Sequence, residues 1–335
     1  MEKVTIYEIA KKAGVSPKTV SRVINNEPSV SKFTNEKILR IIKETNYVPN
    51  ASAQRLSTNR LKTIGLIVPR VGSPYASELI SVILSKCKSN DYISVVYPIE
   101  NSERESEKIL ALYLKRNVDG FIFAPPGSDD QKLFDYLKKR NIPTILITPN
   151  RPYSDFFIVK ATDKIGGYQA TDYLISLGHK KIGIITCIPN RTFAQERLEG
   201  YKKALVSNNL LLNEDFIQYG DNSFSSGFDR TCALMSLEDP PTAIFACNDE
   251  MALGAERALY KMGMQIPENI SLIGFDDITL SSELGVPLTT VKQPVEEIGT
   301  IAVSLFIQLA EKKEIAKKVH EIPTGLVIRS SCMKI

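Results

Sequence analysis

The chain has 335 residues, of which 43% are hydrophobic and 24% are charged. These values are ordinary for a globular protein, and they exclude a disordered or fibrous chain. No stretch reaches the roughly 18 to 20 uninterrupted apolar residues that a membrane helix needs. At about 150 residues per domain, the length indicates two domains and a smaller unit.

Cysteine and histidine usage also limits the function. The five cysteines lie far apart without a CxxC pair, and two histidines are too few for most metal sites. The first residues, MEKVTIYEIAKKAG, lack the apolar core and cleavage site of a secretory signal. The sequence therefore predicts a cytoplasmic protein with no metal and no cofactor.

Charge is divided unevenly along the chain. Residues 1–60 hold eleven Lys and Arg against five Glu, a net charge of +6. Since the whole chain carries +4, the remaining residues carry −2. A short basic end on a mildly acidic body is typical of a polyanion-binding head, although a solvated helical surface would explain the charge alone equally well.

Three short helical patterns follow one another in the basic end. Thr5 and Glu8 form a capping box for the first helix, which ends at Gly14. Ser16 caps the second helix, with Pro17 at its first position, where a missing N–H costs nothing. A third helix is expected over about residues 34–45. Its inward residues are expected to be Ile38, Leu39, Ile41 and Ile42.

Two short helices joined by a tight turn and braced by a third form a helix-turn-helix pattern. The second helix carries Lys18 and Arg22, which can donate to guanine O6 and N7, beside hydroxyls and an amide suited to phosphates. Any small helical domain exposes polar residues, but that alone does not explain two cations and no acid over residues 16–26. The pattern favours DNA reading.

The segments TIYEIAKKAGVSPKTVSRVINN and NYVPNASAQRLSTNR resemble the start of the lactose-repressor (LacI/GalR) family of bacterial transcription regulators. The resemblance implies a helix-turn-helix DNA-binding domain over residues 1–49. It also implies a hinge helix and linker over residues 50–61, in which residues 50–57 fold as a short helix on DNA.

The resemblance assigns DNA contacts residue by residue. Lys18 and Arg22 become base contacts, with Pro17 beside them. Gln54 and Leu56 become minor-groove contacts, Leu56 as an apolar wedge that unstacks and bends the duplex; without the resemblance, Leu56 is a linker residue packing on its neighbours. The expected phosphate or sugar contacts are Thr5, Thr19, Ser21, Asn25, Ser31, Thr34, Tyr47 and Asn50.

From residue 63 onward, short β-rich runs alternate with amphipathic stretches. Near-continuous apolar strands separated by helices are typical of parallel sheets with both faces covered, so the body is predicted to be α/β. The expected strands are TIGLIVP, ISVVYP, GFIFAP, TILIT, KIGIITC, AIFAC and SLIGF. Helical segments are expected to begin near Glu78, Glu103, Asp130, Lys164, Gln195, Ser226, Met251 and Ile298.

The run is too long for one sheet, and the resemblance implies a two-lobed body of the periplasmic-binding-protein type. This effector-binding and dimerisation domain would span residues 62–332. Its N-lobe would hold residues 62–160 and 291–319, and its C-lobe residues 161–290 and 320–332. The chain would cross between the lobes three times, so a ligand in the cleft would contact both lobes and close them.

Ligands of open α/β sheets bind at the carboxyl ends of the strands. Carboxylates there accept from paired hydroxyls while Arg and Asn donate, which suits a polyhydroxylated ligand. The aromatic residues Tyr75 and Phe193 could stack on an apolar face of the ligand, or they could equally pack between the lobes. The same two alternatives, ligand contact or structural role, stay open for Gln293. The expected effector contacts are Tyr75, Phe193, Arg197, Asn222, Asn248, Asp276 and Gln293.

Other polar residues near these loops receive structural roles. Asp249 and Asp277 are interpreted mostly as helix caps, and His179 as a structural hydrogen-bonding residue. Thr148 stands where relatives often have an aspartate, and Asn222 stands where some have an aromatic residue. Because these positions depart from the family pattern, no particular sugar is predicted.

The sequence bears on three classes of function: a ligand-controlled transcription regulator, a transport receptor and an enzyme. A sugar-binding transport receptor would share the body's fold, but the missing export signal and the basic head argue against it. An enzyme is rejected because GxGxxG, GxxxxGK[ST] and GxSxG are all absent. The sequence predicts a homodimeric repressor of operator DNA relieved by a sugar-like effector, with an interface around residues 75–90. Corepression, or control by a partner protein, stays open.

Overall fold

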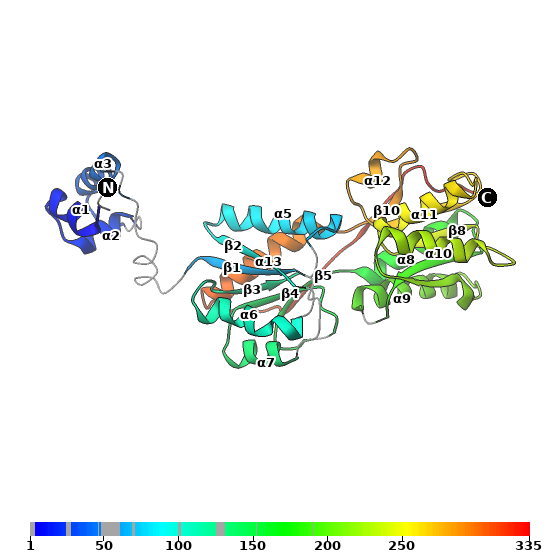
Figure 1. The fold of residues 1–335 in the computed structure, drawn as a ribbon, viewed down its shortest axis with the longest axis horizontal. Helices are drawn as coiled ribbons and strands as arrows, with labels where there is room; N and C mark the ends of the chain where they lie inside the picture. The colour runs from blue at the N-terminus through cyan, green and yellow to red at the C-terminus, as the bar shows by residue number, and fades with distance from the viewer. Residues whose placement is uncertain are drawn as a thin grey trace. The chain divides into compact units, whose positions relative to one another are not determined.

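The computed structural model places two compact units, residues 1–61 and residues 62–335 (Figure 1). We call the first unit the head and the second the body. Within the described part of the chain, no helix has both the length and the apolar character required to cross a bilayer. The structure describes residues 4–24, 28–45, 47, 61–68, 71–99, 102–124, 131–151, 153–189 and 191–335.

The head contains helices α1 (Ile6–Ala13), α2 (Pro17–Ile24) and α3 (Lys32–Glu44). The expected capping box of α1 is present, and Gly14 ends the helix with a φ of 70° that favours glycine. Ser16 Oγ accepts from Thr19 N at 3.1 Å and so caps α2. The predicted helix-turn-helix is confirmed.

One expectation for α3 is wrong. Leu39 is 49% exposed, whereas Ile38 is fully buried and Ile41 and Ile42 pack against the head core. Successive helix positions are about 100° apart, so a stripe through 38, 41 and 42 leaves 39 off the buried face. The four apolar side chains therefore span a wider arc around the helix than the small head core can bury.

A parallel six-stranded sheet forms the first lobe of the body, in the order β11-β5-β4-β3-β1-β2. Strand β1 is buried at every position because helices cover both faces of the sheet. The strands are β1 (Thr63–Val68), β2 (Ile93–Pro98), β3 (Gly120–Phe123), β4 (Thr144–Ile147), β5 (Phe157–Ala161) and β11 (Val319–Ile322).

The helices of the first lobe cover opposite faces of its sheet, as Figure 1 shows. One hydrophobic cluster joins the sheet to α5 (Pro74–Ser89) and α13 (Val295–Ala310). A second cluster joins the other face to α6 (Ser102–Leu114) and α7 (Gln131–Lys139), where Phe134 packs against three aromatic rings of the same core. The sheet is therefore the middle of three layers.

The second lobe has a six-stranded sheet in the order β12-β10-β9-β8-β6-β7, of which only β12 pairs antiparallel. The strands are β6 (Ile182–Cys187), β7 (Ile217–Gly220), β8 (Ala243–Ala246), β9 (Ser271–Asp276), β10 (Thr289–Lys292) and β12 (Gly325–Val327). The helical elements are α8 (Asp163–Ser176), α9 (Thr192–Ser207), η1 (Glu214–Phe216), α10 (Phe224–Met235), α11 (Asp249–Lys261) and α12 (Leu280–Glu283).

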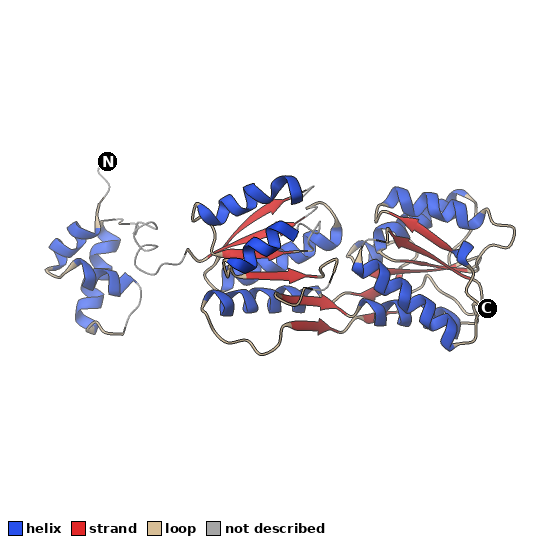
Figure 2. Cartoon of the chain, turned by 90° about the horizontal axis from the view of Figure 1, so that it is seen from below, coloured by secondary structure: helices blue, strands red, loops and turns tan. Residues whose placement is uncertain are grey.

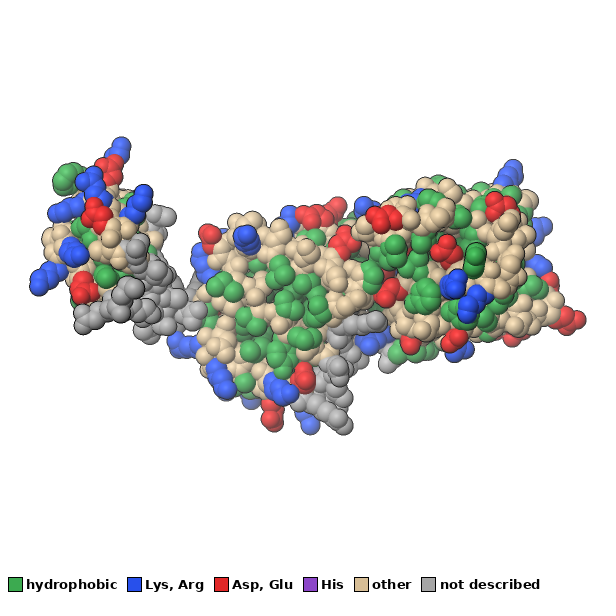
Figure 3. Space-filling model, turned by 45° about the horizontal axis from the view of Figure 1, so that its top comes forward, with side chains coloured by type: hydrophobic (Ala, Val, Ile, Leu, Met, Phe, Trp, Pro, Cys, Tyr) green, Lys and Arg blue, Asp and Glu red, His purple; other side chains and the backbone are tan. Residues whose placement is uncertain are grey.

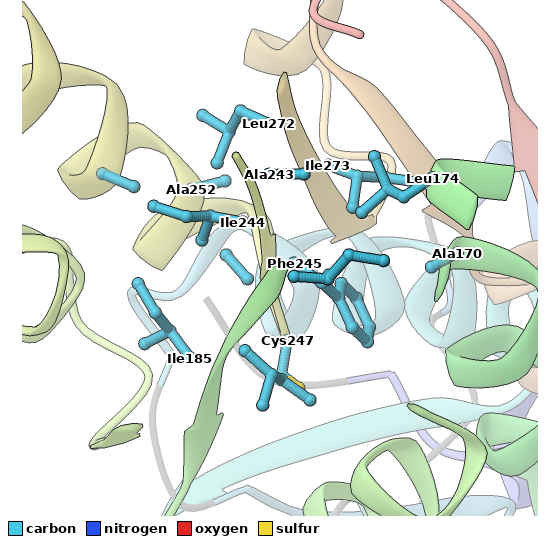
Figure 4. Close-up of a cluster of buried hydrophobic side chains, with 14 of the residues drawn as sticks. Ala170, Leu174, Ile185, Ala243, Ile244, Phe245, Cys247, Ala252, Leu272 and Ile273 are labelled. Atoms are coloured by element: carbon cyan, nitrogen blue, oxygen red, sulfur yellow. The ribbon is translucent and has the colours of Figure 1, made fainter. Parts of the chain in front are cut away.

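Helices also flank this second sheet, as Figure 2 shows. In the close-up of its core, Phe245 of β8 lies near Ala170 and Leu174 of α8, and Ala252 of α11 lies near Ile244 (Figure 4). A strand whose neighbours on both faces are apolar needs an apolar residue at each position, which explains the segment AIFA.

The predicted fold class is confirmed, with each expected strand present and each expected helix beginning within four residues of its predicted start, whereas the four-residue helix α12 was not expected. Five strands escaped prediction: β5, β7, β10, β11 and β12. The chain passes between the sheets after β5, β10 and β11. Because β11 keeps the chain in the first sheet through Ile322, the third crossover comes later than the expected boundary at 319.

Candidate functional site

A cavity of about 230 Å³ lies between the two lobes of the body. Its first-lobe wall comes from the start of α5 and the residue after β4. Its second-lobe wall comes from segments after β6, β7, β8 and β10 and from the end of β9. The seven residues expected from sequence to contact an effector all line it. They are Tyr75, Phe193, Arg197, Asn222, Asn248, Asp276 and Gln293.

Arg197 is the central charged residue of the cavity wall. It is almost fully buried, its Nε donates to Asp163 Oδ1 at 2.7 Å, and its Nη1 donates to the carbonyl of Cys247. Its guanidinium carbon lies 3.6 Å from the centre of the Phe275 ring. Burial lowers its pKa, but Asp163 and Asp276 outweigh that effect and raise it, so Arg197 remains charged.

Asp276 ends strand β9 and faces the same guanidinium. Its Oδ1 lies 3.6 Å from Arg197 Nη1 and accepts from Gln293 Nε2 at 2.9 Å. Burial raises the pKa of the Asp276 carboxyl to about 7, although Arg197 acts in the opposite direction. A carboxyl with this pKa accepts hydrogen bonds when ionised and also donates one when protonated.

Three residues of the cavity wall have a left-handed backbone. The φ angles are 45° at Thr148, 68° at Asn222 and 118° at Asp276. Such angles are uncommon outside glycine, and they gather at ligand clamps and active sites. The strand ends are therefore bent in a way that points these side chains into the cavity.

Asn248 and Asn222 lie together on the second-lobe wall. Asn248 Oδ1 accepts from Met251 N at 2.9 Å, and its Nδ2 donates to the Asn222 carbonyl at 3.2 Å. Asn222 Oδ1 is buried with no hydrogen-bond partner in the structure. A buried acceptor without a donor is costly unless a ligand or water supplies one.

The interpretation of Asp249 and Asp277 as helix caps is wrong. Asn248 is the cap of α11, and the fully buried Asp249 instead accepts from Ile278 N, Ser281 Oγ and Thr290 Oγ1 at 2.6 to 2.9 Å. Asp277 forms an ion pair with Arg329 at 2.6 Å. Both carboxylates fasten the segment that follows β9 rather than a helix end.

The aromatic candidates occupy opposite walls. Tyr75 belongs to α5 of the first lobe, and its pKa is raised by burial and by the charge of Asp276. Phe193 belongs to α9, where its ring centre lies 5.1 Å from the Arg197 guanidinium carbon. Stacking on a ligand and packing between the lobes are both compatible with these places.

Sequence reasoning missed several lining residues. In the sequence Thr148 stands out only as a departure from the family pattern, although it follows β4 directly. The signal that would have found Asp221 is the polar residue after strand β7, but that strand was itself missed. The lining residues outside the predicted set are Ser73, Ala76, Thr148, Arg191, Asp221 and Glu250.

His179 is structural, as expected. The ring is buried, with Nδ1 2.9 Å from Thr242 Oγ1 and Nε2 2.9 Å from Ser271 Oγ. Burial lowers the pKa of the ring. Within the described residues, no three His, Cys, Asp or Glu side chains come together in a way that could hold a metal ion.

The head offers a separate set of candidates. Lys18 is exposed and Arg22 is half-buried on α2, and Figure 3 shows Lys and Arg side chains spread over the visible head surface. Thr5 and Ser31 cap helices with their hydroxyls, and Tyr47 packs in the head core. Pro17, Thr19, Ser21 and Thr34 lie half-buried. The expected contacts outside the described residues are Asn25, Asn50, Gln54 and Leu56.

Comparisons with known proteins cover both units. A family model of bacterial regulatory proteins of the lacI family matches residues 5–50, and a periplasmic binding protein-like domain matches residues 171–332. The HTH-type transcriptional repressor PurR of Haemophilus influenzae (strain PittEE) is 35% identical over 334 residues, which cover 99% of each chain.

Solved structures agree with this relationship. The lac repressor dimer bound to operator and the anti-inducer ONPF is 30% identical, covers 99% of this chain and 100% of that one, and has a TM-score of 0.86. A complex of the transcriptional regulator CelR with cellobiose is 29% identical, covers 98% and 99% of the two chains, and has a TM-score of 0.74. The chain belongs to the lacI family of bacterial regulatory proteins, and it is a DNA-binding transcriptional regulator rather than an enzyme.

Proposed function

We propose that the chain is a cytoplasmic repressor whose operator affinity is controlled by a small sugar-like effector in the cavity between the lobes. One observation carries the proposal: the seven residues expected from sequence, which come from several segments far apart along the chain, line a single cavity of about 230 Å³. Carboxyl, amide and guanidinium groups converge there beside two aromatic rings. That combination suits a ligand with several hydroxyls and an apolar face.

The mechanism follows from the placement of the cavity. A ligand that contacts both walls favours one angle between the lobes, because it binds one arrangement more tightly than the other. In the sequence, the first lobe directly follows residues 50–61, the expected hinge helix and linker. A change in the angle between the lobes can therefore be transmitted to the head. A ligand that weakens operator binding must itself bind less tightly to the DNA-bound protein.

We also propose that the active form is a homodimer whose two heads read a pseudo-palindromic operator. The structurally similar lac repressor was solved as a dimer on its operator. The visible face of the first lobe gathers hydrophobic side chains (Figure 3). Leu84 in α5 and Ile93 in β2 are exposed in this lobe, and they support an interface that includes residues 75–90.

A thermal-shift titration tests the effector class. Full-length protein is heated with D-ribose, cellobiose, other mono- and disaccharides, sugar phosphates and nucleosides. A ligand at 100 times its Kd should stabilise the folded state by about 2.7 kcal/mol. Asp276→Ala should abolish the shift, whereas Asp229→Ala, a change at an exposed acid in α10, should preserve it. A shift that survives Asp276→Ala places the ligand elsewhere.

A second experiment tests the sign of regulation. Genomic fragments retained by the full-length protein are compared with random competitor in a mobility-shift assay, with and without the ligand found by thermal shift. Release of the fragment supports an inducer, and tighter retention identifies a corepressor instead. Binding without preference for any fragment contradicts the proposal.

A further inference from the structure

An ion pair outside the cavity joins the two lobes. Lys160 lies near the end of β5 in the first lobe, and its Nζ donates to Glu196 Oε1 of α9 in the second lobe at 2.8 Å. The same ammonium lies 3.2 Å from Glu321 Oε1 on β11, which is a first-lobe strand. One lysine thus has one carboxylate partner across the lobe boundary and another within its own lobe.

This ion pair is placed at the crossovers of the chain. Lys160 lies two residues before Thr162, and directly after Thr162 the chain enters α8 of the second lobe. Thr324 on another crossover donates its N–H to Thr162 Oγ1 at 3.0 Å. Since a change in lobe angle must bend these crossovers, a contact beside them directly restrains that bending.

Glu196 is rigidly connected to the second lobe. Helix α9 crosses α8 so closely that a Cβ added at Gly167 would lie 2.3 Å from the Arg197 carbonyl oxygen, and one added at Gly200 would lie 2.3 Å from the Lys164 carbonyl oxygen. With backbones in contact, the two helices move together. The restraint on Glu196 therefore acts on the segment that carries the adjacent cavity residue Arg197.

Both partners are largely shielded from water. The side chains of Lys160 and Glu196 are each 22% exposed. Burial lowers the pKa of Lys160, but its bonds to Glu196 and Glu321 outweigh that effect and raise it. Burial raises the pKa of Glu196 against the effect of Lys160. Removing one partner of a pair this shielded costs more than removing one partner of an exposed pair, because it leaves a partly buried charge without its partner.

We propose that the Lys160–Glu196 ion pair is a latch that holds the lobes at the angle seen here. Breaking it frees the crossovers to bend without unfolding either lobe. The latch acts on the same lobe equilibrium as the proposed effector. It does not require that effector, so its test separates its failure from that of the proposed function.

The experiment is hydrogen exchange of full-length protein, without ligand or DNA, in wild type and in Glu196→Gln, Lys160→Gln and the double variant. Glu196→Gln should speed exchange at residues 161–163 and 322–325 about tenfold, which corresponds to about 1.4 kcal/mol. The double variant should exchange no faster than the faster single variant, because both changes remove the same contact.

Glu321→Gln is the matched control, because it removes a carboxylate from the same lysine within one lobe. It should change exchange at both crossovers less than twofold. Equal acceleration by Glu321→Gln and Glu196→Gln would refute the latch, and so would no acceleration by Glu196→Gln. Strand β8, residues 243–246, is the internal reference. Faster exchange there in Glu196→Gln would show general destabilisation of the second lobe and would also refute the latch.

Discussion

The stability of the second lobe should depend strongly on the buried carboxylate of Asp249. It accepts the backbone N–H of Ile278 and the hydroxyls of Ser281 and Thr290, and all three donor residues are buried. Asp249→Ala leaves those donors without their acceptor. Two of the donors, Ile278 and Ser281, lie in the segment that follows Asp276, so the change should loosen one wall of the cavity as well as lower stability.

The magnitude follows from the three donors. An unsatisfied buried donor costs about 1–3 kcal/mol, and the two hydroxyls can rotate toward other acceptors whereas the backbone N–H of Ile278 cannot. We therefore expect Asp249→Ala to lower the free energy of unfolding by about 3–5 kcal/mol near pH 5. Asp249→Asn should cost less, because its amide keeps one acceptor and Thr290 can turn to accept from the new N–H.

The loss should depend on pH. Burial raises the pKa of Asp249 from 3.8 to about 6, although its three hydrogen bonds act in the opposite direction. The folded state thus holds the proton more tightly than the unfolded state, so this group's stabilisation is complete below pH 3.8 and is lost as pH rises through 6. The rise in pKa corresponds to about 3 kcal/mol over the whole range from below pH 3.8 to above pH 6. About 1.4 kcal/mol of this is lost between pH 5 and pH 7, so the deficit of the alanine variant should shrink by about that amount between those pH values.

Urea unfolding of wild type, Asp249→Ala and Asp249→Asn from pH 4 to pH 8 measures these differences. Asp229→Ala, which removes an exposed carboxylate from α10, is the control and should stay within about 0.5 kcal/mol of wild type. An alanine variant as stable as this control would show that the three contacts do not hold the loop. A deficit independent of pH would show that Asp249 titrates near its ordinary pKa.

Three further outcomes can be checked in the same protein. Gly274→Ala should destabilise about as much as Asp249→Ala and be non-additive with it in urea unfolding, because the added Cβ would lie 2.1 Å from Asp249 Oδ1; full additivity would contradict this. Burial lowers the pKa of His179 in the folded state, so wild type should lose stability as pH falls below 6.5. His179→Gln should lose less stability than wild type over that pH range in urea unfolding; an unchanged pH profile would refute this. Arg22→Ala should cost about 1–3 kcal/mol at one operator base pair in a mobility-shift assay, whereas an equal loss on all sequences would make Arg22 a phosphate contact.

Five of the seven predicted strands share one physical property, whereas β2 is partly exposed along its length and β9 is buried except at its last residue. Strands β1, β3, β4, β6 and β8 are buried at every position, so their sequences are unbroken apolar runs that stand out from the helices around them. Of the missed strands, β5, β7, β10 and β11 carry polar or charged residues, and β12 is only three residues long. Thr290 of β10 is fully buried, but its hydroxyl donates to Asp249, which is 41 residues away. The sequence of β10 alone therefore does not reveal that Asp249 is the partner of this buried hydroxyl.

The cavity was predictable to the extent that topology alone brings its walls together. In a parallel sheet the carboxyl ends of the strands meet at one edge, so polar residues after AIFAC and SLIGF had to lie close to one another. Glu250 and Asp221 joined the wall without prediction. Glu250 lies beyond the strand end in a helical turn, and Asp221 follows the missed strand β7.

Adjacent polar residues at a strand end mark the limit of sequence reasoning in this protein. Asn248 lines the cavity while Asp249 turns into the core, and Asp276 lines the cavity while Asp277 pairs with Arg329. The two members of each pair therefore make their contacts on different sides of the chain. Both members of each pair are short polar residues at the same strand end, so the sequence does not show which of them lines the cavity. Only the backbone angles decide which member reaches the cavity, such as the φ of 118° at Asp276, and the surrounding lobe imposes them.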